Sequence, residues 1–163
     1  MTSRRIDPLL LIALLSLTAV AFALVSQHLF DMPPCAWCVF QRLIYLAIAV
    51  VCLLLKLTAT RTPWVRRGGG GLIALMAAGG MAAAWYQYTV AANMFSCDQT
   101  FADRFMVSSG LDASLPWLFG IYATCMEARV DLLGVEYALW SLGLFGLVAL
   151  AGLWAAIRPP NNT

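Results

Sequence analysis

Five cysteines are the residues of this 163-residue sequence that are best able to do chemistry. Cys35 and Cys38 form a CxxC pair, whereas Cys97 and Cys125 are far apart in the chain. In an oxidising compartment these four should form disulfides, and four cysteines allow three pairings, which the sequence leaves open. Two structural disulfides that clamp loops are the simpler interpretation. The fifth, Cys52, lies in an apolar run and is best explained as a small packing residue.

The residues around the CxxC pair argue for exchange rather than clamping. The segment reads Pro33-Pro34-Cys35-Ala36-Trp37-Cys38-Val39-Phe40-Gln41-Arg42. The two prolines disfavour a helix before Cys35 and permit one to begin there. Free N–H groups and the helix dipole stabilise a thiolate at such a helix start, and CxxC thiols in these positions have lowered pKa values. We therefore expect a reactive pair.

Arg42 is the second candidate for chemistry. It follows Cys38 by four residues and so shares its helical face, where it brings a permanent positive charge close to the sulfur. A charged residue at the edge of an apolar segment is costly and indicates a function. An anchor at the membrane interface is the alternative.

Metal and nucleic-acid chemistry are less favoured. A tetrathiolate site built from the four paired cysteines is an alternative, but zinc sites commonly use two closely spaced pairs, and Cys97 and Cys125 are not close. We predict no metal. The single histidine, His28, lies near Asp31 and is more simply an interfacial residue than a proton donor. The sequence has no basic patch with interleaved aromatic residues, so we expect no nucleic-acid partner.

The elements that must position these residues are membrane spans. The composition is 62% hydrophobic and 11% charged with a mean hydropathy of +0.81, whereas a soluble domain carries about 25% charged residues. Four apolar segments, about 8–27, 39–58, 70–90 and 137–157, approach the ~20 residues that cross a bilayer as a helix. We predict a single all-α integral membrane domain, a four-helix transmembrane bundle.

The distribution of Lys and Arg predicts the orientation. The side that holds the termini and the loop at about 59–69 carries Arg4, Arg5, Lys56, Arg61, Arg66, Arg67 and Arg158; the other side, with loops at about 28–38 and 91–136, carries Arg42, Arg104 and Arg129. The positive-inside rule makes the termini cytoplasmic and the two loops external. A cleaved signal peptide is an alternative for the first span, which is longer than a usual signal sequence.

The sequence resembles the disulfide bond formation protein B (DsbB) family over nearly its whole length. The resemblance lies in Pro-Cys-x-x-Cys-x-x-Gln-Arg at the start of the second span, in Cys97 and Cys125 in a long second external loop, and in Leu132-Leu133-Gly134 before the last span. This family belongs to the DsbA, DsbB and quinone system that keeps the bacterial periplasm oxidising. The resemblance implies a quinone-dependent protein-disulfide oxidoreductase in the bacterial inner membrane.

The resemblance also implies a role for each cysteine. Cys97, paired with Cys125, would form a mixed disulfide with a reduced periplasmic partner, a thioredoxin-fold protein like DsbA. Cys125 would then exchange with Cys35, and Cys38 would pass the electrons to a membrane quinone, either ubiquinone or menaquinone.

The quinone site would include Arg42 and Gln41 beside Cys38, with Arg42 orienting the ring; no proton donor is assigned. A quinone reductase resembling vitamin K epoxide reductase is the alternative enzyme, but its CxxC lies on a later helix. A membrane scaffold with structural disulfides is the alternative from another class of protein.

Overall fold

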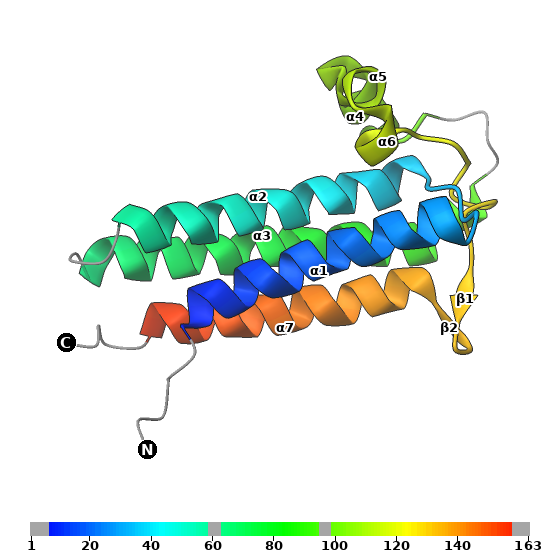
Figure 1. Cartoon of the computed structure of the whole chain (residues 1–163). Helices are drawn as coiled ribbons and strands as arrows, with labels where there is room; N and C mark the ends of the chain where they lie inside the picture. The colour runs from blue at the N-terminus through cyan, green and yellow to red at the C-terminus, as the bar shows by residue number, and fades with distance from the viewer. Residues whose placement is uncertain (1–6, 59–62, 95–98, 158–163) are drawn as a thin grey trace.

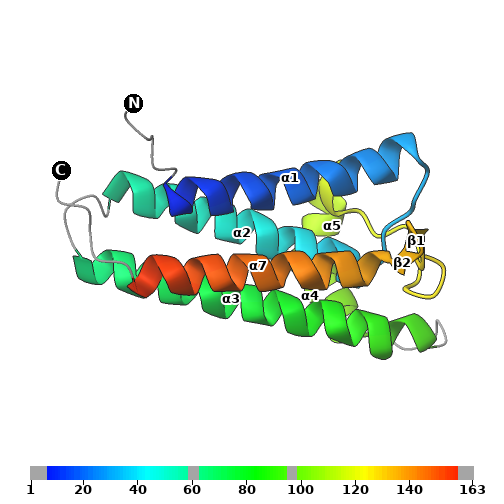
Figure 2. The ribbon, with the colours of Figure 1, turned by 90° about the horizontal axis from the view of Figure 1, so that it is seen from below.

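Four long helices form the body of the protein. The structure is a computed structural model that describes residues 7–58, 63–94 and 99–157. Helices α1 (Pro8–Leu29), α2 (Ala36–Thr58), α3 (Pro63–Thr89) and α7 (Tyr137–Ile157) run side by side (Figures 1 and 2). Each is long and apolar enough to cross a membrane. The predicted all-α four-helix membrane bundle is confirmed.

The bundle is apolar on its outside as well as in its core, which is the pattern of helices surrounded by lipid rather than water. The buried core includes Ile12, Ile48, Ile73 and Phe145. Large apolar side chains also point outward along the helices, among them Leu14, Leu54, Leu75 and Leu150.

Tyr45 and Phe145 join α2 to α7 in the middle of this core. Their rings stack with centroids 4.0 Å apart and planes 2° from parallel, and the Tyr45 hydroxyl donates to the Ser141 carbonyl at 3.1 Å. Gly80 on α3 makes room for the stack, because a Cβ there would lie 2.3 Å from the Phe145 ring. The buried tyrosine therefore has its polar atom satisfied.

The four consecutive glycines Gly68–Gly71 are helical, which corrects the sequence prediction. We expected a loop at about 59–69 and a span from 70, but α3 already begins at Pro63. A Cβ on Gly70 would lie 2.7 Å from the Ala156 backbone nitrogen and 2.8 Å from the Gly152 carbonyl oxygen. Glycine here allows two helix backbones to touch, so close packing outweighs its low helix propensity.

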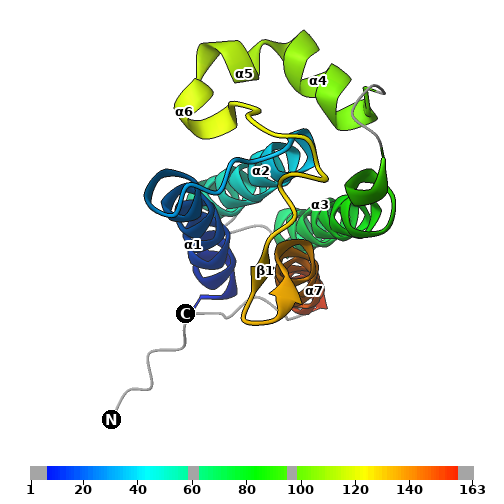
Figure 3. The same ribbon diagram turned by 90° about the vertical axis from the view of Figure 1, so that its right-hand side faces the viewer.

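The segment between α3 and α7 holds all the short elements, and Figure 3 shows them gathered at one end of the bundle, which we call the loop end. They are η1 (Ala91–Asn93), α4 (Phe101–Ser109), α5 (Leu111–Ser114), α6 (Pro116–Phe119), β1 (Asp131–Leu132) and β2 (Val135–Glu136).

Helix α4 has clear start and stop signals and packs on α2. Thr100 and Asp103 form a capping box at its N-terminus, and Gly110 ends it with a φ of 67°. Phe40 of α2 meets Phe101 and Phe105 edge to face, with ring centroids 6.0 and 5.5 Å away. The aromatic contacts hold this part of the loop against the CxxC end of α2.

Strands β1 and β2 form a hairpin just before α7. Leu132 pairs with Val135 across a two-residue turn. Both turn residues have left-handed backbones, Leu133 with a φ of 56° and Gly134 with a φ of 78°, as in a type I′ turn. A left-handed backbone costs a residue such as leucine about 1–2 kcal/mol. The Trp140 indole donates to the Leu132 carbonyl at 3.1 Å and ties the hairpin to α7.

Candidate functional site

The CxxC pair lies where α2 starts. The helix begins at Ala36, and the Cys35 carbonyl accepts a hydrogen bond from the Val39 N–H at 3.1 Å. The sulfurs of Cys35 and Cys38 are 3.1 Å apart. They are in contact without a bond, since a disulfide is about 2.05 Å long. The first turn of the helix thus sets the two thiols side by side, as the spacing predicts.

Cys35 does not follow the expectation that both thiols are acidified. It is fully buried among apolar side chains that include Ala36 and Ala83. Burial raises the pKa of Cys35 well above its ordinary value, and its hydrogen bonds to Cys125 and Cys38 raise it further. At this position the removal of the thiol from water raises its pKa more than the helix dipole lowers it. Cys35 therefore stays a protonated thiol when reduced.

Cys125 is brought to this pair by the segment after α6. The backbone N–H groups of Tyr122 and Ala123 donate to the Pro34 carbonyl at 3.0 and 3.3 Å, immediately before Cys35 in the chain. Cys125 packs against Cys35 and shares a side-chain hydrogen bond with it. Three sulfurs therefore form a continuous row from the loop to α2. Cys97 lies outside the described residues.

A short turn fixes Cys125 in place. The Glu127 carboxylate accepts from the Thr124 backbone N–H at 2.9 Å and from its hydroxyl at 2.8 Å, and the Ala128 N–H donates to the Thr124 carbonyl at 2.9 Å. These bonds from Thr124, the backbone bond first, hold the pKa of Glu127 below its usual value. The turn is a capping box around the cysteine.

Gln87 of α3 is a contact of Cys38 that the sequence analysis did not select. Its side-chain amide donates to the Cys38 sulfur at 3.2 Å, while its oxygen accepts from the Gln41 amide at 2.7 Å. Both glutamines are buried. Gln41 therefore orients Gln87 so that its N–H group faces the sulfur. The sequence could have indicated Gln87, because it is a polar residue inside a predicted membrane span, where polar side chains commonly have a function.

Arg42 lies inside the bundle and not at a lipid boundary, which argues against the alternative of an anchor at the membrane interface. Its side chain is 5% exposed. Nη1 donates to Gln27 Oε1 at 2.6 Å and to the Leu118 carbonyl at 3.1 Å, and Nη2 to the Ala23 carbonyl at 3.4 Å. The bonds from α1 and α6 compensate for its burial. The buried Arg42 Nε–H has no hydrogen-bond partner within the described residues.

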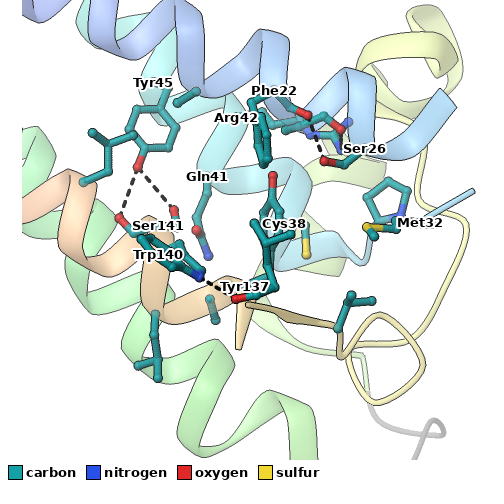
Figure 4. Close-up of a pocket in the computed structure, with 18 of the residues that line it drawn as sticks. Phe22, Ser26, Met32, Cys38, Gln41, Arg42, Tyr45, Tyr137, Trp140 and Ser141 are labelled. Carbon is teal, nitrogen blue, oxygen red and sulfur yellow. Dashed lines mark hydrogen bonds between the residues drawn. The ribbon is translucent and has the colours of Figure 1, made fainter. Parts of the chain in front are cut away.

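A cavity of about 660 Å³ lies beside these groups, with Cys38, Gln41 and Arg42 on its wall (Figure 4). Along α1 its lining runs from Ser26 to Leu15, which is about 16 Å of helix at 1.5 Å per residue. Most of the remaining lining is apolar.

The opposite wall belongs to α7, where the lining extends from Tyr137 to Leu147. Helices α1 and α7 pack together much less closely than α3 and α7 do. The cavity is thus elongated, polar at the end near Cys38 and apolar along the rest. A planar ring with carbonyl oxygens and a long hydrocarbon chain, as in a quinone, fits that shape and those donors.

His28 lies outside this cavity. Its Nε2–H donates to the Trp117 carbonyl at 3.1 Å, next to the Leu118 carbonyl that accepts from Arg42. His28 therefore helps to hold α6 on α1.

Cys52 is buried in the apolar core, as a packing residue would be. Within residues 7–58, 63–94 and 99–157, no group of three or more His, Cys, Asp or Glu side chains is placed to hold a metal ion.

The fold and the site together define a class: a four-helix membrane protein in which a loop cysteine lies against a CxxC pair, and the second cysteine of that pair lines a cavity together with an arginine. The sequence comparisons give the family. A model described as "Disulfide bond formation protein DsbB" matches residues 4–155. The chain belongs to the DsbB family.

Curated relatives agree with this assignment. Disulfide bond formation protein B of Herminiimonas arsenicoxydans is 34% identical over 148 residues, covering 90% of this chain and 92% of that protein. The protein of the same name from Ralstonia nicotianae is 33% identical and covers 91% and 92%. That from Azoarcus sp. (strain BH72) is 33% identical and covers 83% and 82%. The chain is therefore a membrane disulfide-forming oxidoreductase.

Proposed function

We propose that this protein is a bacterial inner-membrane enzyme that re-oxidises a periplasmic DsbA-like partner with a membrane quinone, either ubiquinone or menaquinone. The row of sulfurs from Cys125 through Cys35 to Cys38 is the observation that carries the proposal. It joins an exposed loop to the wall of an apolar cavity. A protein whose disulfides only clamp loops has no need for that connection.

The overall reaction balances without another reactant. The partner loses two electrons and two protons as its dithiol becomes a disulfide, and the quinone gains them to become a quinol. Inside the protein each step is thiol–disulfide exchange, in which an attacking thiolate displaces one sulfur of a disulfide. The partner reduces the Cys97–Cys125 disulfide by attack at Cys97. Cys125 then attacks Cys35, so that the Cys35–Cys38 bond breaks and Cys38 leaves with the electron pair.

The surroundings of the two CxxC sulfurs suit their different parts in this exchange. The thiolate that leaves is Cys38, and the Gln87 amide and the Arg42 charge both stabilise a negative sulfur there. Cys35 is the sulfur that is attacked, so it has no need to be acidic. A bound quinone supplies the two-electron acceptor, and Arg42 and Gln41 would hold its ring against Cys38.

The orientation rests on the positive-inside distribution, which puts the loop end in the periplasm. Lys56, in the last turn of α2, lies at the other end of the bundle. A partner in the periplasm would then meet the loop that carries Cys97 and Cys125. The oxidising compartment and the entry point for electrons lie on the same side.

Replacement of Cys97 tests the order of the relay. A Cys97→Ser protein should no longer take electrons from a reduced partner, while its Cys35–Cys38 pair, reduced chemically, should still reduce a soluble quinone analogue. Quinone absorbance and the thiol count of the partner report the two halves separately. Oxidation of the partner by Cys97→Ser at the wild-type rate would refute the proposed order.

A further inference from the structure

The tip of the β1–β2 hairpin carries a leucine that neither its turn nor its packing explains. A turn with two left-handed residues prefers Asn-Gly or Asp-Gly, yet Leu133 has a φ of 56° ahead of Gly134. Its side chain is 88% exposed, so it packs little against the rest of the protein. A residue kept against its backbone preference is a reason to look for a contact outside the protein.

The hairpin is divided into a charged base and an apolar tip. Asp131 and Glu136 face each other at the base, and Glu136 pairs with Arg129 at 3.2 Å. The tip between Asp131 and Glu136 carries no charge and reads Leu132-Leu133-Gly134-Val135. Strands rise about 3.3 Å per residue, so the tip lies about 7 Å from the charged base. The apolar face of an interfacial helix lies at a similar depth in a bilayer, about 5–10 Å.

The hairpin lies at the height where two of the spans end. Along the bundle axis it stands beside the end of α1 and the start of α7 (Figures 1 and 2). Seen from the loop end, it reaches the outer edge of the bundle between these two helices (Figure 3). Leu29 and Phe30 at the end of α1 are 76% and 66% exposed, so apolar side chains still point outward at this height. The lipid-facing surface of the bundle therefore continues onto the hairpin.

Trp140 attaches the hairpin to α7 at that height. Its indole N–H donates to the Leu132 carbonyl at 3.1 Å, and its side chain is 49% exposed. Tryptophan is enriched where a membrane meets water, because its ring is apolar while its N–H group is polar. A hairpin attached through this side chain is held at the boundary between lipid and water.

We propose that the hairpin is a membrane anchor, in which Leu133 inserts into the boundary between headgroups and acyl chains of the leaflet at the loop end. Contact with lipid compensates for the backbone preference that the turn gives up. The charged base stays among water and headgroups, where its ions keep their hydration. The anchor fixes the depth at which α7 begins. It needs only the bilayer that the four spans require, so it does not depend on the proposed electron acceptor.

A spin label at position 133 tests the insertion. In the oxidised enzyme the reactive cysteines are paired and Cys52 is buried, so the introduced thiol of Leu133→Cys is the one that reacts, and oxidised wild type is the blank. The labelled protein in phosphatidylcholine vesicles is exposed to oxygen, which concentrates in hydrocarbon, and to a nickel chelate, which stays in water. We expect the ratio of oxygen to nickel accessibility to be several-fold higher in Leu133→Cys than in Asp131→Cys, the matched control in the base of the same hairpin. Leu150→Cys, on the outward face of α7, gives the value for full contact with lipid.

Equal ratios in Leu133→Cys and Asp131→Cys would overturn the proposal, because the tip would then lie in water. A label at position 133 that is reached by nickel and becomes immobile only when a reduced DsbA-like partner is added would also overturn it, since the leucine would then contact protein. Leu133→Trp gives a second readout without a label. Lipid brominated on its acyl chains should quench the added fluorescence of Leu133→Trp and not that of Asp131→Trp, and equal quenching in the two would contradict the anchor.

Discussion

At the residue scale, Arg42 carries an electrostatic cost, because its guanidinium is buried in an apolar bundle. Three acceptors, Gln27 Oε1 and the carbonyls of Leu118 and Ala23, use its two terminal nitrogens. They fix the plane of the group at the cavity wall and leave Nε–H without a partner in the described part of the chain. A residue held in this way is pre-organised to bind an oxygen atom of a ligand.

Neutralising Arg42 should weaken quinone use while the protein still inserts and forms its disulfides. Loss of a charge-assisted hydrogen bond costs about 1.5–3 kcal/mol, so the KM for quinone should rise about ten- to a hundred-fold in Arg42→Gln. Arg42→Lys should be intermediate, since it keeps the charge and loses the planar donor set. Steady-state kinetics with a soluble quinone analogue measure the effect. Arg104→Gln, at an exposed position of α4 outside the cavity lining, is the control. Unchanged kinetics in Arg42→Gln would reduce this arginine to a structural role.

Gln87 should act on the Cys38 thiolate rather than on quinone affinity. Gln87→Leu removes the N–H donor to the sulfur at similar volume, and a hydrogen bond to a charged group is worth about 1.5–3 kcal/mol. We expect the Cys35–Cys38 disulfide to become harder to reduce, which is a lower reduction potential, with the KM for quinone little changed. Equilibration with glutathione redox buffers gives the potential. A Gln87→Leu protein with the wild-type potential would show that the contact has no bearing on the thiolate.

The element scale shows how separate segments reach the site. Helix α6 offers adjacent carbonyls to two residues from different helices, with Trp117 accepting from His28 and Leu118 accepting from Arg42. The segment that follows binds the Pro34 carbonyl and so carries Cys125 to Cys35. The loop is thus attached to α1 and α2 at points that also hold the reacting groups.

Loosening the Thr124–Glu127 turn should slow the exchange between Cys125 and Cys35. A protein with Cys38 and Cys97 replaced by serine keeps only this pair at the site, and mild oxidation then measures the rate of Cys35–Cys125 bond formation. Loss of the cap in Glu127→Gln should slow that rate about two- to five-fold, whereas Asp112→Asn elsewhere in the loop should not. The pKa of Glu127 is lowered in the fold, so the cap is complete above the ordinary pKa of a glutamate and is lost as the pH falls through the lowered value. A rate that is the same in Glu127→Gln and wild type would remove the turn from the account.

Composition and spacing predicted the large elements and most of the site, for physical reasons that are local. Apolar runs of span length have few other stable structures in a membrane, and the CxxC spacing puts two thiols on one helical turn. What remained hidden depends on contacts between distant residues. The contact between Gln87 and Gln41 joins residues that are 46 positions apart in the sequence. The helical conformation of the glycine run depends on close packing against α7. The burial that raises the pKa of Cys35 comes from several segments of the chain.

At the scale of the whole molecule, the orientation requires the loop end, which carries the four site cysteines, to face the outside of the cell membrane. A membrane-impermeant thiol reagent added to reduced spheroplasts should label Cys97 and Cys125 without lysis, and should spare the fully buried Cys35 and Cys52. Single-cysteine variants and mass spectrometry assign each label. If Cys97 and Cys125 reacted only after lysis, the topology would be inverted and the periplasmic partner would be excluded.

The central claim is that electrons from a protein dithiol leave through Cys38 to a quinone, and coupled turnover tests it most directly. Purified protein is mixed with a reduced DsbA-like protein and a soluble quinone analogue, and quinol formation and partner disulfides are counted together. The account predicts one quinol for each disulfide formed in the wild type and no sustained turnover in Cys38→Ser. Partner oxidation without quinol, or wild-type turnover in Cys38→Ser, would contradict it.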